Sequence, residues 1–254
     1  MDPQLPLQDR VALVTGAGRN IGRAIALALA RAGATVAVNV RSSRDEGEAA
    51  VEAIRAAGGN AVLVTADVTR RADVDAMVSS VTREYGRLDV LVNNAAVRLE
   101  RAFADMSYED WRAALDVCLD GAFHCTQAAL PWLCRSPNGA VVNIGGMTAS
   151  TGASARAHVV TAKAALSGLT RALAHELAPS DITVNCVSPG LVDTVRKPGS
   201  ASANPQHRAR HATLLGRRGH PDEIAAAVVW LCGPGGRFTT GQTIHINGGA
   251  YLGG

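Results

Sequence analysis

Short apolar runs alternate with longer amphipathic segments along the whole chain, and this alternation restricts the fold more than any other feature. Each run is rich in Val, Leu, Ile or Ala, as buried parallel strands are, and a segment with helical periodicity usually follows it. The runs predict seven strands, at Val11–Val14, Thr35–Val40, Ala61–Thr65, Asp89–Val92, Gly139–Ile144, Ile182–Val187 and Thr243–Ile246. Because strand–helix units pack as a parallel sheet with helices on both faces, we expect a three-layer α/β fold with a doubly wound parallel sheet.

Capping and stop signals set the expected helix boundaries. Ser107 begins one helix with Asp110 at the capping-box position, Thr69 is expected to cap another, and Gly33 ends the first. The expected helices are Ile21–Ala32, Arg44–Ala57, Thr69–Tyr85, Ser107–Leu130, Ala155–Leu177 and Asp222–Leu231. Residues 195–215 mix Pro, Gly, Ser, Ala and basic residues without periodicity, so they are predicted to form a mobile loop.

Length and composition favour one soluble domain, residues 1–254. Lys and Arg total 25 against 22 for Asp and Glu, and this near balance argues against a nucleic-acid-binding surface. No uncharged apolar run reaches the ~18 residues that span a bilayer, and residues 1–10 lack the apolar core of a signal peptide. The five cysteines form no CxxC pair and the seven histidines are scattered. We therefore expect reduced thiols, no metal site, no membrane partner and a cytoplasmic location.

A glycine-rich turn follows the first predicted strand, with the sequence Thr15-Gly-Ala-Gly-Arg-Asn-Ile-Gly22. Glycines allow a tight turn, and the helix that begins near Ile21 directs free N–H groups and its positive dipole end toward it. Such a turn is typical of a phosphate-binding site, although a purely structural turn has the same sequence signature.

From this turn onward the chain resembles the short-chain dehydrogenase/reductase family. The family's TGxxxGxG is present with Asn20 in place of the middle glycine, a residue that tolerates left-handed backbone. Asp67-Val68, Asn93-Asn-Ala-Ala96 and Pro189-Gly-Leu-Val-Asp-Thr194 resemble the family's adenine, NNAG and nicotinamide segments. The resemblance covers nearly the whole chain and implies a single-domain Rossmann fold that binds a nicotinamide dinucleotide. It implies cofactor contacts at Gly16, Arg19, Asn20, Ile21, Gly22, Arg41, Asp67, Val68, Asn93, Ala95, Lys163, Pro189, Gly190, Val192 and Thr194.

The end of the second strand bears on which cofactor is bound. NAD-specific members carry an acid there that binds the ribose 2′-hydroxyl. Val40 takes that place, Arg41 follows it, and Arg19 could approach the same point. Because guanidinium groups pair with phosphate, this arrangement favours NADP(H) over NAD(H). The alternative is that Arg41 is an ordinary solvated arginine.

The resemblance also exposes a gap in the expected chemistry. Members of the family use a Tyr as general acid/base, a Lys four residues later, a Ser thirteen residues before the Tyr, and an Asn on the preceding long helix. Lys163 is present and is the one implied catalytic residue, but the other three positions hold Val159, Gly146 and Cys118. None of the three supplies the hydroxyl or amide that the family uses there. General acid–base catalysis is worth ~10²–10⁴-fold, so the usual ketone reduction is expected to be severely impaired.

Neighbouring side chains suggest what the pocket accepts. The resemblance places Gly146 and Val159 in the substrate pocket. Arg156 is expected there too, because it lies two helical turns before Lys163 on nearly the same face, although a simple surface ion pair is the alternative. His158 is one position from Val159 and is expected to point about 100° away. Arg98 and a run of basic residues between 194 and 221 predict a positive rim that attracts an anionic small molecule, although a solvated charged face is the alternative.

Three functions therefore stay open from sequence alone. The first is an oxidoreductase that moves a hydride between NADP(H) and a carbonyl, imine or activated alkene through a non-standard active site. The second is an NADP(H)-binding pseudoenzyme that acts as a sensor or scaffold. The third is a non-redox lyase or isomerase. Family resemblance further implies a homotetramer paired through the long helices near 110–130 and 155–177.

Overall fold

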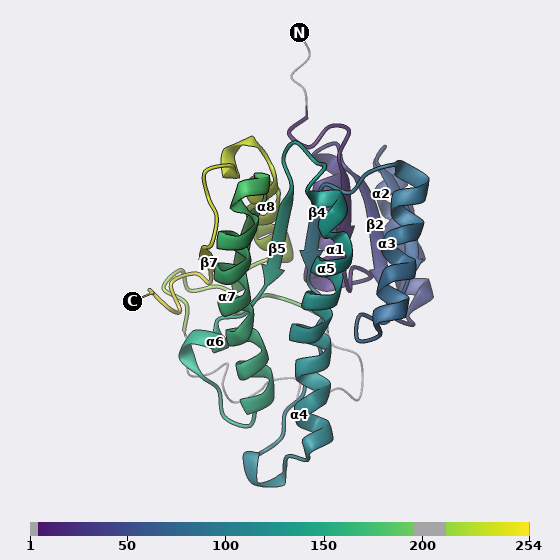
Figure 1. Cartoon of the computed structure of the whole chain (residues 1–254). Helices are drawn as coiled ribbons and strands as arrows, with labels where there is room; N and C mark the ends of the chain where they lie inside the picture. Colours follow the sequence, from purple (N-terminus) through teal and green to yellow (C-terminus); the bar gives the residue numbers. More distant parts are fainter. Residues whose placement is uncertain (1–4, 196–211, 254) are drawn as a thin grey trace.

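The computed structural model describes residues 5–195 and 212–253, and these residues fold as an α/β sandwich (Figure 1). Within them, seven parallel strands form one sheet in the order β3-β2-β1-β4-β5-β6-β7. The strands are β1 Val11–Val14, β2 Thr35–Val40, β3 Asn60–Thr65, β4 Val90–Asn93, β5 Ala140–Ile144, β6 Thr183–Pro189 and β7 Thr243–Ile246. The doubly wound three-layer Rossmann fold is thus confirmed, and each predicted strand is found within two residues of its expected bounds.

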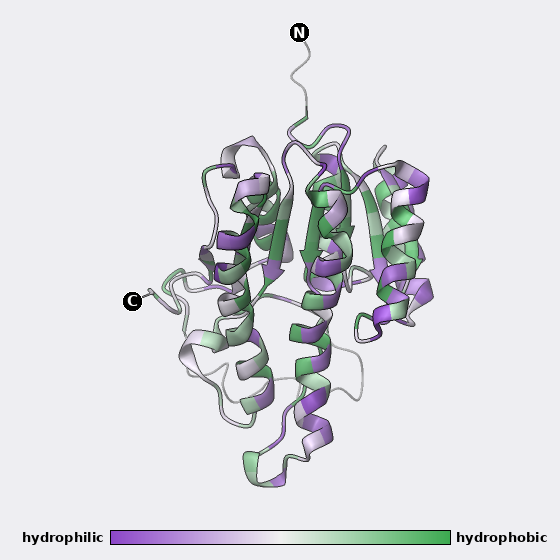
Figure 2. Ribbon diagram, in the orientation of Figure 1, coloured by the Kyte–Doolittle hydropathy of each residue, from purple (hydrophilic) through white to green (hydrophobic). Residues whose placement is uncertain are grey.

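Helices cover both faces of this sheet, and Figure 2 shows their apolar sides turned toward it. Ala, Ile, Val and Leu side chains of α1, α2 and α8 join one buried cluster, and those of α3, α5 and α7 join the other. The α-helices are α1 Asn20–Arg31, α2 Arg44–Ala56, α3 Arg71–Tyr85, α4 Tyr108–Leu115, α5 Gly121–Leu133, α6 Thr148–Thr151, α7 Ala157–Leu177 and α8 Pro221–Cys232. Short 3₁₀ turns occupy Phe103–Asp105, Ala178–Ser180 and Pro234–Gly236. No helix in the described part of the chain is both long and apolar enough to cross a bilayer.

Two helix predictions need correction. Thr69 does not cap α3, which begins at Arg71; the Thr69 hydroxyl instead donates to Asp67 Oδ1 at 2.8 Å, in a turn that precedes the helix. The single helix expected over Ser107–Leu130 is interrupted by a π-helical turn, Asp116–Asp120, between α4 and α5. The Arg112 guanidinium binds the carboxylates at both ends of that turn. The predicted capping box of Ser107 and Asp110 is confirmed.

The chain order reverses between β1 and β4, because β2 and β3 lie on one side of β1 and the remaining strands on the other. Loops that leave the carboxyl ends of these two strands must diverge to opposite sides of the sheet. In open α/β sheets the crevice formed there is where ligands bind. The fold therefore places the turn after Val14 beside the segment after Asn93.

At the opposite end of the sheet, a buried carboxylate joins β1, β4 and the segment before β5. Asp89 is 1% exposed and accepts hydrogen bonds from the Arg87 guanidinium, the Ser136 hydroxyl and the Val11 amide. Burial by itself raises the pKa of Asp89, but these hydrogen bonds and the Arg87 charge outweigh it and hold the pKa below its ordinary value. The ionised form therefore stabilises the fold.

We predict that Asp89→Asn lowers the free energy of unfolding by about 2–3 kcal/mol at neutral pH, since an amide leaves Arg87 and one donor without a charged partner. Because the folded pKa is depressed, the Asp89 contribution is present above the unfolded pKa of about 4 and is lost as pH falls through the folded value. Urea unfolding measured at neutral pH and again below that window tests both statements. Asp75→Asn, on an exposed α3 carboxylate, is the matched control. A destabilisation that is unchanged at acid pH would contradict the linkage.

Candidate functional site

A cavity of about 630 Å³ lies at the carboxyl ends of the strands, on both sides of the β1–β4 divide. Loops after β1 to β6 and the first turns of α7 contribute to its wall. Of the residues expected to contact cofactor, those found in the wall are Gly16, Arg19, Asn20, Ile21, Gly22, Arg41, Asp67, Val68, Ala95, Lys163, Pro189, Gly190 and Val192. The expected substrate-pocket residues Gly146, Arg156 and Val159 line it as well. The structure thus gathers residues that are up to 176 positions apart, from Gly16 to Val192.

The glycine-rich turn is shaped by close approach to the segment after β4. Gly16 has a φ of 62°, and a Cβ on Gly22 would collide with the Gly16 carbonyl oxygen and the Asn94 side chain. Asn94 Nδ2 donates to the carbonyl oxygens of Thr15 and Gly16 at 2.9 and 3.0 Å. The backbone amides of Asn94 and Ala95 both donate to the Thr15 hydroxyl at 3.0 Å. Asn94, which the sequence analysis did not single out, therefore fixes the turn.

Asn93 lies behind the pocket wall instead of in it. Its side chain is buried and donates to Asn143 Oδ1 at 2.9 Å and to the Thr126 hydroxyl at 3.1 Å. Asn143 is the register partner of Asn93 in β5 and donates in turn to the Thr170 hydroxyl of α7. Because side chains alternate along a strand, Asn93 faces the helical layer while Asn94 faces the turn. Asn93 therefore supports the wall from behind, and its expected cofactor contact stays a prediction.

The segment after β6 crosses the mouth of the cavity and is held at two points. Asn20 has a φ of 51°, and its amide donates to the Val195 carbonyl at 3.0 Å while accepting from the Val195 amide at 2.9 Å. Arg98 donates to the Thr194 hydroxyl at 3.2 Å from the opposite wall. Thr194 is outside the cavity wall, and its expected cofactor contact stays a prediction. Most of the loop predicted over residues 195–215 lies outside the described residues.

One end of the cavity combines cations with a carboxylate that sequence reasoning missed. Arg19 and the exposed Arg41 line it, together with the serine residues at 42 and 43. Glu46, from the first turn of α2, lies among them and pairs with Arg19 across 3.8 Å. The sequence predicted two guanidiniums without an acid here, and the helical phase of α2 accounts for the difference, because it turns Glu46 toward the cavity.

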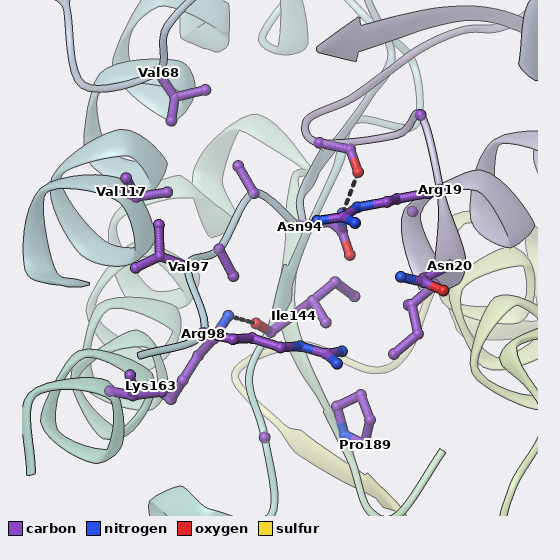
Figure 3. A pocket seen from close by; sticks show the side chains of 18 of the residues that line it. Arg19, Asn20, Val68, Asn94, Val97, Arg98, Val117, Ile144, Lys163 and Pro189 are labelled. Carbon is purple, nitrogen blue, oxygen red and sulfur yellow. Dashed lines mark hydrogen bonds between the residues drawn. The ribbon is translucent and has the colours of Figure 1, made fainter. Parts of the chain in front are cut away.

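The other end holds Lys163 (Figure 3), and Val159 and Gly146 line the same cavity. Lys163 is buried, and its Nζ donates to the Ile144 carbonyl oxygen at 2.5 Å. Val159 lies one turn earlier on α7 and is also buried. A Cβ on Gly146 would meet no described atom within 4 Å, so the space at this position is open. Cys118 is buried in the π-helical turn, and its neighbour Val117 is the one that lines the cavity.

His158 is buried outside the cavity wall, as its helical phase predicts. Neither ring nitrogen has a hydrogen-bond partner among the described residues, and burial lowers the pKa of this imidazole. Its position is therefore one of packing between α7 and the α4 region. Within residues 5–195 and 212–253, no three His, Cys, Asp or Glu side chains are grouped as a metal site would require.

Comparisons with known proteins agree with this architecture. The profile of the family described as enoyl-(acyl carrier protein) reductase matches residues 16–251. The chain is 39% identical to a 3-oxoacyl-(acyl-carrier-protein) reductase of Staphylococcus aureus over 95% of this chain and 98% of that protein. It is also 39% identical to a short-chain reductase protein of Streptomyces niveus, over 95% and 94% of the two chains.

Solved structures give the same result. A short-chain dehydrogenase from Burkholderia cenocepacia, crystallised with NADP, superposes with a TM-score of 0.89 at 35% identity, covering 96% of this chain and 99% of that one. A dehydrogenase/reductase from Sinorhizobium meliloti superposes with a TM-score of 0.91 at 34% identity, covering 98% of each chain. This protein belongs to the short-chain dehydrogenase/reductase family.

Proposed function

We propose that this protein is an NADP(H)-dependent oxidoreductase that transfers a hydride to or from a carbonyl, imine or similar small molecule through a non-standard active site. The observation that carries the proposal is one continuous cavity with a glycine turn in its wall, arginines at one end and Lys163 at the other. The name of the Staphylococcus aureus relative and the NADP in the Burkholderia cenocepacia structure support it.

The residues present fit a dinucleotide phosphate. The crowding of Gly16 and Gly22 leaves backbone and helix N–H groups at the turn, where a pyrophosphate is favoured. Arg19 and Arg41 would hold the 2′-phosphate, and Asp67-Val68 would contact the adenine. Lys163 would bind the nicotinamide ribose, and Pro189, Gly190 and Val192 would bound the nicotinamide.

The chemistry expected of the reaction end differs from that of other family members. When bound, the nicotinamide supplies or accepts the hydride. Val159 and Gly146 cannot give a proton or a side-chain hydrogen bond to a substrate oxygen. Lys163 is buried, and its ammonium group is fixed by a hydrogen bond that it donates to the Ile144 carbonyl oxygen. It stabilises negative charge on the oxygen and can pass a proton to it, which the amine regains from water.

Turnover is the direct test of the proposal. Purified protein mixed with NADPH and separate ketone, imine and activated-alkene substrates should oxidise the cofactor, which is followed by its near-ultraviolet absorbance. Tight NADPH binding without oxidation by any of these would instead favour the second candidate, a cofactor-binding pseudoenzyme. The absence of hydroxyl side chains at Val159 and Gly146 is the observation that supports the pseudoenzyme as a second candidate. The same mixture analysed for isomerised or cleaved substrate tests the non-redox alternative.

Arg41→Ala should weaken binding of NADP⁺ by about 10- to 100-fold, the worth of a hydrogen bond to a charged group, and should leave NAD⁺ binding nearly unchanged. Isothermal titration calorimetry with each nucleotide measures both effects. Arg44→Ala, an exposed arginine three residues later that pairs with Glu48, is the matched control. Glu46→Gln should act in the opposite direction and tighten NADP⁺, because it removes a negative charge from the same end. Equal losses for both nucleotides in Arg41→Ala would contradict the assignment.

Introducing the two family hydroxyls is expected to create ordinary reductase chemistry. The double variant Val159→Tyr/Gly146→Ser should raise kcat for a neutral ketone such as ethyl acetoacetate by ~10²-fold or more, the range of general acid catalysis. The serine has room, since no described atom lies within 4 Å of its Cβ position.

The single variant Gly146→Ser controls for the glycine substitution alone, because it adds one hydroxyl without the tyrosine. Adding Lys163→Ala to the double variant should abolish the gain. A double variant that binds NADP⁺ normally yet is no faster than the natural protein would refute the view that these positions limit the usual chemistry.

We also propose a cytoplasmic homotetramer, in keeping with the family resemblance. The cysteines are unpaired, and Phe123 of α5 together with Ala164 and Gly168 of α7 are exposed on the helical surface that would pair. Small residues permit close helix approach. Light scattering that gives the mass of one chain would contradict this assembly.

A further inference from the structure

The reaction end of the cavity is positively charged. Its described lining residues include three cations, Arg98, Arg156 and Lys163, and one carboxylate, Glu100. Most of the remaining wall is apolar or glycine, including Val97, Val117, Met147 and Val159, with a hydroxyl at Thr148. Lys163 is buried and Arg156 half-buried, so these two cations are screened less by water than charges at an open surface, whereas Arg98 is exposed.

Arg156 is held in this wall by the backbone. It is the N-cap of α7, and positions 156, 159 and 163 fall on one helical face, so all three line the same cavity. The preceding Ala155 has a φ of 58°, a left-handed conformation that is unfavourable for alanine. The Arg101 amide fixes it by donating to the Ala155 carbonyl at 2.8 Å. Strained backbone is concentrated at functional sites, so the strain at Ala155 indicates that the position of Arg156 is functionally important.

Arg98 comes from a different part of the chain, the segment that follows β4. Its side chain extends into the cavity toward Pro189 and the segment after β6 (Figure 3). One of its guanidinium nitrogens donates to the Thr194 hydroxyl at 3.2 Å. A guanidinium has five N–H donors and can therefore bind more than one partner at a time. The two arginines thus line the cavity from two different segments of the chain.

We propose that the substrate is an oxo-acid whose carboxylate binds Arg156, with Arg98 contributing charge, while its carbonyl lies near Lys163 and Gly146. The inference rests on the proposed function and names its substrate class. The planar fork of a guanidinium matches a carboxylate in a bidentate pair. Val159 cannot donate a proton to the substrate. The cations around the carbonyl compensate for this in part, because they stabilise the negative charge that develops on its oxygen.

The experiment compares acids with their methyl esters, which differ in the charge. Acetoacetate, 4-oxopentanoate and 2-oxobutanoate, each beside its ester, are titrated by calorimetry into protein saturated with NADP⁺. At least one acid should bind about 10- to 100-fold more tightly than its ester, as for a hydrogen-bonded charge. Arg156→Gln should remove that preference without changing NADP⁺ affinity, and Arg156→Lys should keep part of it. Phosphonoacetone serves as a further arm, and preference for it over every acid would overturn the carboxylate assignment.

Arg101→Ala is the matched control, since this arginine pairs with Asp110 outside the cavity wall and supports Ala155 through its backbone only. It should keep the preference for acids. Acids and esters that bind equally, in protein that binds NADP⁺, would overturn the oxo-acid inference and leave the proposed function standing. Failure to bind NADP⁺ at all would overturn both.

Discussion

The contact between the glycine turn and the segment after β4 is the constraint on which the rest of the site depends. Thr15, Gly16 and Asn94 are joined by hydrogen bonds of 2.9–3.0 Å where the strand order reverses, so the Asn94 amide and the Thr15 hydroxyl connect the two halves of the sheet. Gly22 completes this approach because any Cβ there would collide with Gly16 and Asn94. The cavity extends to both sides of this contact, so the contact fixes how its lining residues, such as Arg41 and Lys163, lie relative to one another.

The sequence predicted what is encoded locally. Strand bounds came from apolar runs of Val, Leu and Ile that end at turn residues, and these signals depend on neighbours only a few positions away. The glycine turn and Lys163 were predicted by motif spacing in the same way. The π-helical turn was not predicted, since Arg112, Asp116 and Asp120 fit a regular helix equally well until packing selects one geometry.

Side-chain direction was the part that the sequence left undetermined. Asn93 and Asn94 are adjacent and chemically identical, yet one faces Asn143 in the helical layer and the other the glycine turn. Glu46 points toward the cavity because of the rotation of α2 about its axis relative to β2, and no local sequence pattern specifies that rotation. The pairing of Asn20 with Val195 joins residues 175 positions apart. The family motif has a glycine at position 20, and the structure explains the asparagine found there. Its side-chain amide binds the Val195 backbone and so holds the segment after β6 against the cavity.

The glycines of the cavity differ in what they require of the backbone and of the space around it. Gly22 is obligatory on steric grounds, and Gly16 needs its left-handed backbone. Gly146 has neither reason, because its φ is not in the left-handed region and open space surrounds its Cβ position. The fold would accept a serine there, so the glycine is not required by the scaffold. The residues that fix the glycine turn, Gly16, Gly22 and Asn94, lie on other segments than Gly146 and Val159, although all of them except Val159 follow strands of the same sheet. A substitution at position 146 or 159 therefore leaves the contacts that fix the glycine turn in place.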